Sequence, residues 1–331
     1  MNNNSLKFIF FGSSEFSVII LEELLGQNYR PLTIVTTPDK PSGRKKILTA
    51  TPVKILALKE NIPILQPEKL DEDFLKTLDP RSAGLALAGT RSEAVGNDEN
   101  EIDIFIVASY GKIIPKNILT LPRLGCLNIH PSLLPKYRGA SPIQTALLNG
   151  DKETGVTIML MDEKLDHGPI LSSLACPIAE TENFLELHNR LAIMGAELLI
   201  KILPDFLTNK IKMTEQNHAA ATFSKIINKT DGEISWQKPA REIHNQWRAF
   251  HLWPGIFGEL IIKNKKIKIN FTVINLTKNI NKNILPGEYE IINKKLYVAS
   301  GDKYLLEIIK LQPAGKKEMT AAEFINGYLK I

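Results

Sequence analysis

The stretch Leu6-Lys7-Phe8-Ile9-Phe10-Phe11-Gly12-Ser13-Ser14 lies near the start of this 331-residue chain and decides its fold class. Its first six residues are almost all apolar and have the length of a strand, which is typical of a strand buried on both faces. The Gly-Ser-Ser turn leads into residues 15–26, where apolar residues recur at helical spacing. A buried strand, a short turn and an amphipathic helix predict the first unit of a parallel sheet covered by helices.

Strand and helix patterns continue to alternate as far as residue 203. Thr51-Pro52 and Ser141-Pro142 each predict a helix start, because Thr or Ser caps the first turn and proline fits the first helical position. Further strands are predicted at 32–35, 62–65, 102–108, 125–130, 154–161 and 170–178, and helices at 69–78 and 181–203. The alternation predicts an α/β fold, with a Rossmann-like, mostly parallel sheet whose ligand site lies beyond the carboxyl ends of its strands.

The C-terminal third follows a different pattern. Short predicted strands, separated by Gly and Asn turns, lie at 258–262, 266–273, 288–292, 295–299 and 304–311. Such a series predicts a small β-barrel domain of the OB-like kind. We therefore predict an α/β domain over residues 1–207, a linker over 208–221 and a β-barrel domain over 222–331.

Residues 79–101 differ in composition from the rest of the chain. They contain no Lys and no Ile, although both are common elsewhere, and are instead rich in Ala, Gly, Ser and acidic residues. Such a segment buries little apolar surface. We expect a mobile surface insertion within the α/β domain.

Charge is unevenly distributed along the chain. The formal net charge is +5, yet residues 222–331 carry 18 Lys and Arg against 10 Asp and Glu, whereas residues 1–221 carry 23 against 26. A basic module beside a slightly acidic one indicates a polyanionic partner. The alternative is that a chain rich in Asn, Lys and Ile simply accumulates lysines.

Hydropathy and cysteine content limit the location of the protein. The apolar runs have strand length, far below the ~20 residues of a membrane helix, and the first five residues lack the features of a signal peptide. The two cysteines, Cys126 and Cys176, are too few for a disulfide scaffold. We expect a cytoplasmic protein with no membrane partner.

Candidate catalytic groups lie at the end of the predicted strand 125–130. Asn128 and His130 are two residues apart, so their side chains point to the same face, where an amide and an imidazole can stabilise a developing oxyanion. The run Pro131-Ser132-Leu133-Leu134-Pro135 is stiffened by its prolines and suits a rigid wall for a flat ligand. In the run Asp162-Glu163-Lys164-Leu165-Asp166-His167-Gly168, which follows the next predicted strand, an acidic residue before the Gly turn can reach back to His130. Taken singly, each feature also has a purely structural interpretation, as a packed strand end or an ordinary turn.

Together, these features resemble the signature of the folate-dependent formyltransferases. The chain contains, in order, Asn-x-His at 128–130, Ser-Leu-Leu-Pro-x-x-Arg-Gly at 132–139, Glu-Thr-Gly-Val-Thr at 153–157 and Leu-Asp-x-Gly at 165–168. The resemblance implies that Asn128, His130 and Asp166 form the catalytic trio and that 10-formyltetrahydrofolate is the formyl donor. By the same resemblance, the residues expected to line the donor site are Ser132, Leu133, Leu134, Pro135, Tyr110, Gly111 and Ile113. We expect no metal, because the sequence lacks His-Glu-x-x-His and Cys-x-x-Cys patterns.

The resemblance extends to both ends of the chain and narrows to the methionyl-tRNA formyltransferases. The basic run at 37–46 resembles their tRNA-contacting loop, and Asp-Gly-Glu-Ile-Ser-Trp at 231–236 and Trp-Pro-Gly at 253–255 resemble their C-terminal domain. This implies that Arg44, Lys45 and Lys46 contact tRNA and that residues 222–331 bind its backbone. The implied activity is formylation of the methionine carried by initiator tRNA, by a monomer. One departure is Gly-Ser-Ser-Glu-Phe at 12–16, where the family more usually has Gly-Thr-Pro-x-Phe.

Other functions share parts of this pattern. An amino-sugar N-formyltransferase shares the trio, but a small sugar nucleotide does not require the basic residues between 39 and 54. A formyl-folate hydrolase would use water as acceptor, and a glycinamide-ribonucleotide transformylase would match only the first ~200 residues by family analogy. A non-catalytic RNA-binding protein would not require the trio. For Trp236, Trp247 and Trp253, core packing is favoured over stacking on nucleotides.

Overall fold

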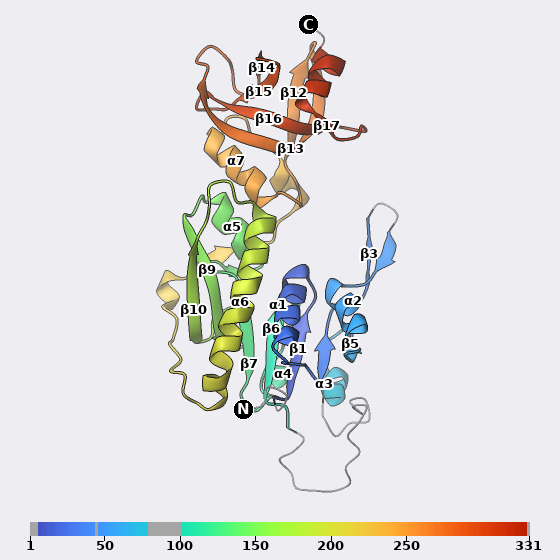
Figure 1. Cartoon of the computed structure of the whole chain (residues 1–331), viewed down its shortest axis with the longest axis vertical. Helices are drawn as coiled ribbons and strands as arrows, with labels where there is room; N and C mark the ends of the chain where they lie inside the picture. The colour runs from blue at the N-terminus through green and yellow to red at the C-terminus, as the bar shows by residue number, and fades with distance from the viewer. Residues whose placement is uncertain (1–5, 44–45, 79–100, 330–331) are drawn as a thin grey trace. The chain divides into compact units, whose positions relative to one another are not determined.

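The computed structural model describes residues 6–43, 46–78 and 101–329 (Figure 1). The predicted insertion at 79–101 lies outside the described residues, except for Glu101. The chain divides into two compact units. The first comprises the described parts of Met1–Gly139, Thr154–Cys176 and His188–Phe223. The second comprises Ala140–Glu153, Pro177–Leu187 and the described part of Ser224–Ile331.

The first unit contains a seven-stranded sheet with the order β10-β9-β7-β6-β1-β2-β5. Its strands are β1 (Phe8–Gly12), β2 (Thr33–Val35), β5 (Ile64–Leu65), β6 (Ile104–Ala108), β7 (Cys126–His130), β9 (Glu153–Leu160) and β10 (Ile170–Pro177). Five adjacent strands of this sheet are parallel to one another, namely β5, β2, β1, β6 and β7. Strand β9 pairs with β7 in the antiparallel direction. The predicted Rossmann-like, mostly parallel sheet is confirmed.

Strand β1 lies inside the sheet and is buried along its whole length. Phe8, Ile9, Phe10 and Phe11 have no solvent-exposed surface. This is the physical reason for the uninterrupted apolar run, because a strand with partners on both sides and covered faces has no polar side. The helices of this unit are α1 (Glu15–Gly26), α2 (Pro52–Lys59), α3 (Glu72–Leu78), α4 (Lys116–Leu119) and most of α6 (Phe184–Leu207). As predicted, Thr51 caps α2 by accepting a hydrogen bond from the Lys54 N–H.

The strand order reverses between β1 and β6, so their carboxyl ends mark the switch point at which such sheets bind ligands. Two serines connect these ends: Ser13 of the Gly-Ser-Ser-Glu-Phe sequence, and Ser17 directly after that sequence. The Ser17 hydroxyl donates to the Ala108 carbonyl at 2.6 Å, and the Ser13 hydroxyl donates to the Tyr110 carbonyl at 3.1 Å. The departure at 12–16 therefore supplies a cross-link at the end of the sheet.

A short antiparallel hairpin that the sequence patterns did not predict follows β2. It is formed by β3 (Lys40–Ser42) and β4 (Ile47–Thr49). The side chains of Ile47 and Leu48 are largely exposed. At the base of the hairpin, the Asp39 carboxylate accepts hydrogen bonds from Lys54 at 2.7 Å and from Gln66 at 2.8 Å.

The second unit is built on an antiparallel sheet with the order β12-β13-β16-β15-β14, to which β17 adds beside β16. The strands are β12 (Phe257–Ile262), β13 (Lys265–Ile280), β14 (Tyr289–Ile292), β15 (Lys295–Ala299), β16 (Tyr304–Pro313) and β17 (Met319–Thr320). Pairing along β13 is irregular at three places, which bends a long strand. The sheet is curled into a half-barrel, which confirms the predicted second fold element. Its strand order runs from β12 to β14 without closing a ring (Figure 1).

Helices α5 (Pro142–Leu148), α7 (Ala240–Ala249) and α8 (Ala321–Phe324) complete the second unit. Trp247 of α7 donates to the Thr272 carbonyl, and Trp236 packs its ring edge-on against Phe271. Trp253 is different, because 57% of its surface is exposed. Core packing is therefore wrong for Trp253, which lies in the turn after α7.

Candidate active site

The three residues of the predicted trio come together in the first unit. Asn128 and His130 lie at the carboxyl end of β7, and Asp166 lies in the turn between β9 and β10. The Asn128 amide nitrogen donates to Asp166 Oδ1 at 3.3 Å, and His130 Nδ1 lies 3.7 Å from the same oxygen. One carboxylate therefore faces both side chains that the alternation of β7 places on one side.

Asp166 is held in an unusual backbone conformation. Its φ of 47° lies in the left-handed region, which side chains other than glycine rarely adopt. Its second oxygen, Oδ2, accepts the Gly139 N–H at 2.7 Å. The carboxylate is thus fixed by donors from two directions, and only about a tenth of its side chain is exposed. Such fixation keeps a charged group in one orientation, as catalysis by a positioned carboxylate requires.

The tautomer of His130 follows from its hydrogen bond to the backbone. Its Nε2 lies 3.1 Å from the carbonyl oxygen of Tyr137. A carbonyl can only accept, so Nε2 carries a hydrogen and, in the neutral ring, Nδ1 carries the lone pair. In this tautomer the buried His130 ring presents Nδ1, a proton-accepting nitrogen, beside the Asp166 carboxylate.

The predicted wall at Ser132, Leu133, Leu134 and Pro135 directly follows β7 and is tied to β9. The Thr157 hydroxyl donates to the Ser132 carbonyl at 2.7 Å and accepts the Leu134 N–H at 3.2 Å. The Glu-Thr-Gly-Val-Thr sequence explains the close packing, because a Cβ at Gly155 would lie 2.6 Å from the Leu133 side chain. Thr157 was not singled out by the sequence, yet it is the side chain that fixes this loop.

The other residues predicted to line a donor site follow β6. The Tyr110 ring packs edge-on against Phe11 in the core, and burial raises its pKa to about 12. Among the described residues, the buried Tyr110 hydroxyl has no hydrogen-bond partner. Gly111 has a φ of 83°, which suits glycine, and Ile113 is 85% exposed. In the loop after β6, the backbone and the Ile113 side chain are thus the parts that can contact a ligand.

Two buried polar residues near the trio escaped the sequence analysis. Arg138 belongs to the Ser-Leu-Leu-Pro-x-x-Arg-Gly sequence, and Gln216 lies in the segment expected to be a linker. Both are almost fully buried, and the Gln216 side-chain oxygen accepts hydrogen bonds from the Arg138 guanidinium. A single Gln in a polar stretch without periodicity carries no sequence signal for such a role.

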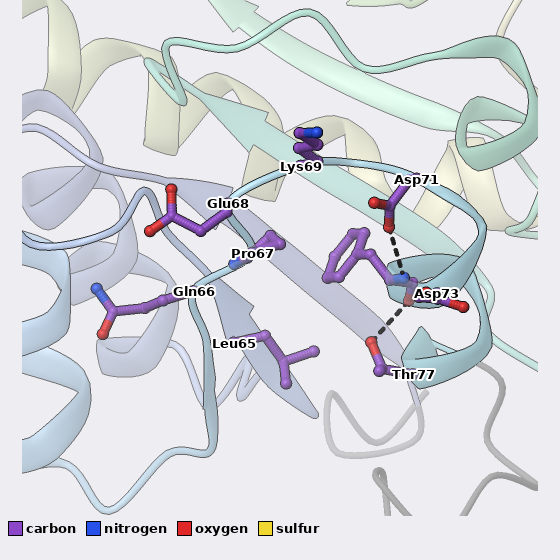
Figure 2. Close-up of a pocket in the computed structure, with 9 residues that line it drawn as sticks. Leu65, Gln66, Pro67, Glu68, Lys69, Asp71, Asp73 and Thr77 are labelled. Carbon is purple, nitrogen blue, oxygen red and sulfur yellow. Dashed lines mark hydrogen bonds between the residues drawn. The ribbon is translucent and has the colours of Figure 1, made fainter.

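A groove of about 430 Å³ lies beyond the carboxyl end of β5, where it meets the start of α3 (Figure 2). Its lining comprises Leu65, Gln66, Pro67, Glu68, Lys69, Asp71, Asp73, Phe74 and Thr77. Asp71 caps α3 by accepting the Phe74 N–H at 3.1 Å. Three carboxylates against one lysine make this groove unattractive to an anionic ligand. None of the trio lines it.

Of the three residues predicted to contact tRNA, the structure describes Lys46, in the turn before β4. Arg44 and Lys45 lie outside the described residues. Lys46 is described and exposed, with a φ of 49°. The exposed Ile47 and Leu48 follow it directly. The hairpin thus combines a basic sequence with exposed apolar side chains.

Two features are absent from the part of the chain that the structure describes. Over 6–43, 46–78 and 101–329, no helix has the length and apolar character needed to cross a bilayer. The same residues contain no group of three or more His, Cys, Asp or Glu side chains placed to hold a metal ion.

Comparison with known proteins identifies the class and then the branch. The formyl transferase family profile matches residues 6–203, and that of the formyl transferase C-terminal domain matches residues 226–329. A methionyl-tRNA formyltransferase of Halalkalibacterium halodurans is 39% identical over 97% of this chain and 95% of its own. That of Enterococcus faecalis is 40% identical over 97% and 96%. The chain therefore belongs to the formyl transferase family, in the branch of the methionyl-tRNA formyltransferases.

Solved structures share the fold. A sugar 3N-formyl transferase, crystallised with dTDP and 5-N-formyl-THF, is 22% identical with a TM-score of 0.63, covering 95% of this chain and 99% of its own. An N-formyltransferase of Helicobacter canadensis, in complex with folinic acid and dTDP-3-aminofucose, is 19% identical with a TM-score of 0.64, covering 93% and 99%. At this level of identity the likeness concerns the fold alone.

Proposed function

We propose that this enzyme transfers the formyl group of 10-formyltetrahydrofolate to the α-amino group of methionine on initiator tRNA. The observation that carries the proposal is the convergence of Asn128 and His130 on the Asp166 carboxylate, at 3.3 and 3.7 Å. This arrangement occurs in a chain whose relatives along its whole length are methionyl-tRNA formyltransferases.

Each member of the trio has a role that follows from its geometry. When bound, the donor supplies an electrophilic formyl carbon for the amine to attack. The Asn128 amide uses one N–H for Asp166 and, within the described residues, has no second acceptor, so the other N–H is available to the formyl oxygen as negative charge develops. His130 Nδ1 accepts the proton lost by the amine, and Asp166 stabilises the resulting imidazolium. The imidazolium then returns this proton to the donor nitrogen as the bond between that nitrogen and the formyl carbon breaks, so that deformylated tetrahydrofolate leaves.

The donor fits beside the trio better than in the acidic groove next to α3. Folates carry carboxylates, which the groove lined by Glu68, Asp71 and Asp73 would repel. The half-buried Leu133 and Pro135 instead provide apolar surface directly after His130. Ser132, Leu134, Tyr110, Gly111 and Ile113 complete the proposed donor site.

The tRNA is proposed to bind through two basic elements. Arg44, Lys45 and Lys46 act near the acceptor end, and the excess of Lys and Arg in 222–331 contacts the phosphate backbone. The proposal includes a monomeric cytoplasmic enzyme that needs no metal. It also includes the division into a catalytic domain at 1–207, a linker at 208–221 and a tRNA-binding domain at 222–331.

One assay tests the function against its nearest alternatives. The protein is incubated with 10-formyltetrahydrofolate and, in parallel, with methionyl initiator tRNA, a nucleotide-linked amino sugar, or buffer alone. Formylmethionine on the tRNA supports the proposal. Formylation of the sugar without formylation of the tRNA would establish the amino-sugar transferase, and rapid release of formate in buffer would establish a hydrolase.

A further inference from the structure

The Gln216 side chain bridges the turn that carries Asp166 and Arg138, whose two neighbours in sequence contact the trio. Its Nε2 donates to the carbonyl of Asp166 at 3.0 Å and to that of Gly168 at 2.8 Å. Its Oε1 accepts from Arg138 Nε at 3.2 Å and from Nη2 at 2.6 Å. Only 5% of the Gln216 surface is exposed, and three of these four bonds are buried.

Arg138 lies between the two residues whose backbones contact the trio. The carbonyl of Tyr137 accepts the hydrogen of His130 Nε2, and the N–H of Gly139 donates to Asp166 Oδ2. The position of the Arg138 guanidinium therefore sets the backbone that orients both the imidazole and the carboxylate. Thr222 holds this backbone from the other side, because its carbonyl accepts the Arg138 N–H and its hydroxyl accepts the Tyr137 N–H, each at 2.9 Å.

The Asp166 turn needs an external support of this kind. Its left-handed φ is unfavourable for an aspartate. Gly168, two residues later, is packed so closely that a Cβ there would lie 1.9 Å from the Leu160 carbonyl oxygen. The two carbonyls that Gln216 binds flank this tight turn, so the amide group holds the turn in the conformation that aims Asp166 at Asn128 and His130.

A second series of contacts, which does not involve Gln216, fixes the Arg138 guanidinium. Arg138 Nη2 lies 2.9 Å from His218 Nδ1, and the His218 ring stacks on His167 at 3.9 Å between centroids. His167 Nδ1 lies 2.6 Å from an oxygen of Asp162. The arginine that Gln216 binds is therefore itself held in place, and Gln216 transmits a fixed position to the Asp166 turn.

We propose that Gln216 is a positioning residue that couples Arg138 to the Asp166 turn and so holds the carboxylate in register with His130 and Asn128. The inference rests on the proposed function of the trio. It also assigns Gln216 and His218, within the segment predicted to be a linker, and Thr222, the first residue of the predicted β-barrel domain, to the support of the active site.

Two substitutions separate the donor role of Gln216 from its acceptor role. Gln216→Ala removes both sets of bonds. Gln216→Glu keeps an acceptor for Arg138 but removes the donor and brings negative charge to two carbonyl oxygens. We expect both variants to lower kcat about 10-fold or more, because misplacing a catalytic group by ~1 Å costs on this scale. The KM for the folate donor should stay within about twofold, since the apolar loop that follows His130 is unchanged.

The chain offers a matched control in its second unit. Gln246 is 7% exposed, and its Nε2 likewise donates to two carbonyls, those of Asp231 at 2.7 Å and Glu233 at 3.0 Å. Gln246→Ala removes a comparable pair of buried donor bonds, between residues that all belong to the second unit. It should lower Tm while leaving kcat at saturating substrates nearly unchanged.

A substrate-free measurement keeps the inference testable if the proposed function fails. Nitrogen-15 spectra of histidine-labelled protein report the His130 ring directly, with its signals assigned by His130→Gln. We expect the His130 signals to move in Gln216→Ala and Gln216→Glu and to stay in place in Gln246→Ala. Wild-type protein that does not formylate methionyl-tRNA would refute the proposed function alone. Unmoved His130 signals, or full kcat in Gln216→Glu, would overturn the positioning role.

Discussion

The trio and the β3–β4 hairpin are built in opposite ways. Asn128 and His130 are 9% and 4% exposed and are held by hydrogen bonds from neighbouring segments. Ile47 and Leu48 of the hairpin are 63% and 66% exposed. A group that moves protons needs a fixed geometry and a water-poor environment, whereas a surface that meets a large polyanion needs reach. The buried, fixed trio is therefore suited to catalysis, and the exposed hairpin is suited to recognition of a large partner.

The hairpin nevertheless has a fixed base. The Asp39 carboxylate accepts hydrogen bonds from Gln66 and Lys54, and these bonds lower its pKa. Lys54 belongs to α2 and Gln66 follows β5, so the base is attached to two elements of the sheet domain. The exposed side chains thus project from a hairpin whose base is held by hydrogen bonds. Substitutions of these exposed residues should change tRNA binding without changing the stability of the fold.

The largest expected effect separates the trio from everything else. His130→Ala and Asp166→Ala should each reduce kcat about 100-fold or more, the scale for losing a positioned acid–base or oxyanion group. Because neither residue lies in the basic elements, affinity for charged tRNA should barely change. Single-turnover formylation and tRNA binding measured on the same preparations check both statements. Near-normal turnover of His130→Ala would remove the imidazole from the mechanism.

Substitutions in the hairpin should give the converse result. Arg44→Ala and Lys46→Ala should lower kcat/KM for initiator tRNA about 10-fold, because misplacing the acceptor end misaligns the reacting amine. Tm should stay unchanged, since Lys46 is exposed. Leu58→Ala, an exposed apolar substitution on α2, serves as a surface control. If the hairpin variants formylate normally, the basic run is only a solvated surface, and the contrast with the trio loses its functional meaning.

The salt dependence of binding should sharpen the contrast further. Each phosphate contact contributes about one unit to the slope of log affinity against log salt. Replacing the exposed Lys263 and Lys265 of the second unit by Gln should therefore reduce the slope by up to about two units if both contact the backbone. His130→Ala should leave the slope as it is. If the wild type binds tRNA tightly with an affinity that does not depend on salt concentration, the proposal that phosphate contacts hold the tRNA is wrong.

The smallest expected effect concerns Cys126, which should not react with thiol reagents in the folded protein. Cys126 lies on β7, two residues before Asn128, and burial raises the pKa of its thiol to about 12. At pH 8 the thiol is protonated and enclosed, so it should resist thiol reagents as long as the protein is folded. A cysteine introduced by Leu48→Cys should react at the rate of a free thiol. Rapid labelling of native wild type would show that β7, the strand carrying Asn128 and His130, opens readily.

Much of the fold could be predicted from local patterns, because each of those patterns has a local cause. The apolar run at β1 reflects burial on both faces, and Thr51-Pro52 marks the start of α2 because capping and proline geometry act within one turn. The β3–β4 hairpin could not be predicted in the same way. Its strands are three residues long and lack alternation of apolar and polar residues.

The active site shows the same division between local and long-range causes. Asn128 and His130 share a face because side chains alternate along a strand, so the sequence alone determines their side. The sequence also determined the family, since its motifs recur in order along the chain. The distance of Asp166 from His130, the tautomer of His130, and the supporting contacts of Arg138 and Gln216 were decided only by the tertiary structure. Apart from the His130–Tyr137 hydrogen bond that sets the tautomer, these contacts join residues 27 to 78 positions apart, and no local rule of backbone geometry extends over that separation.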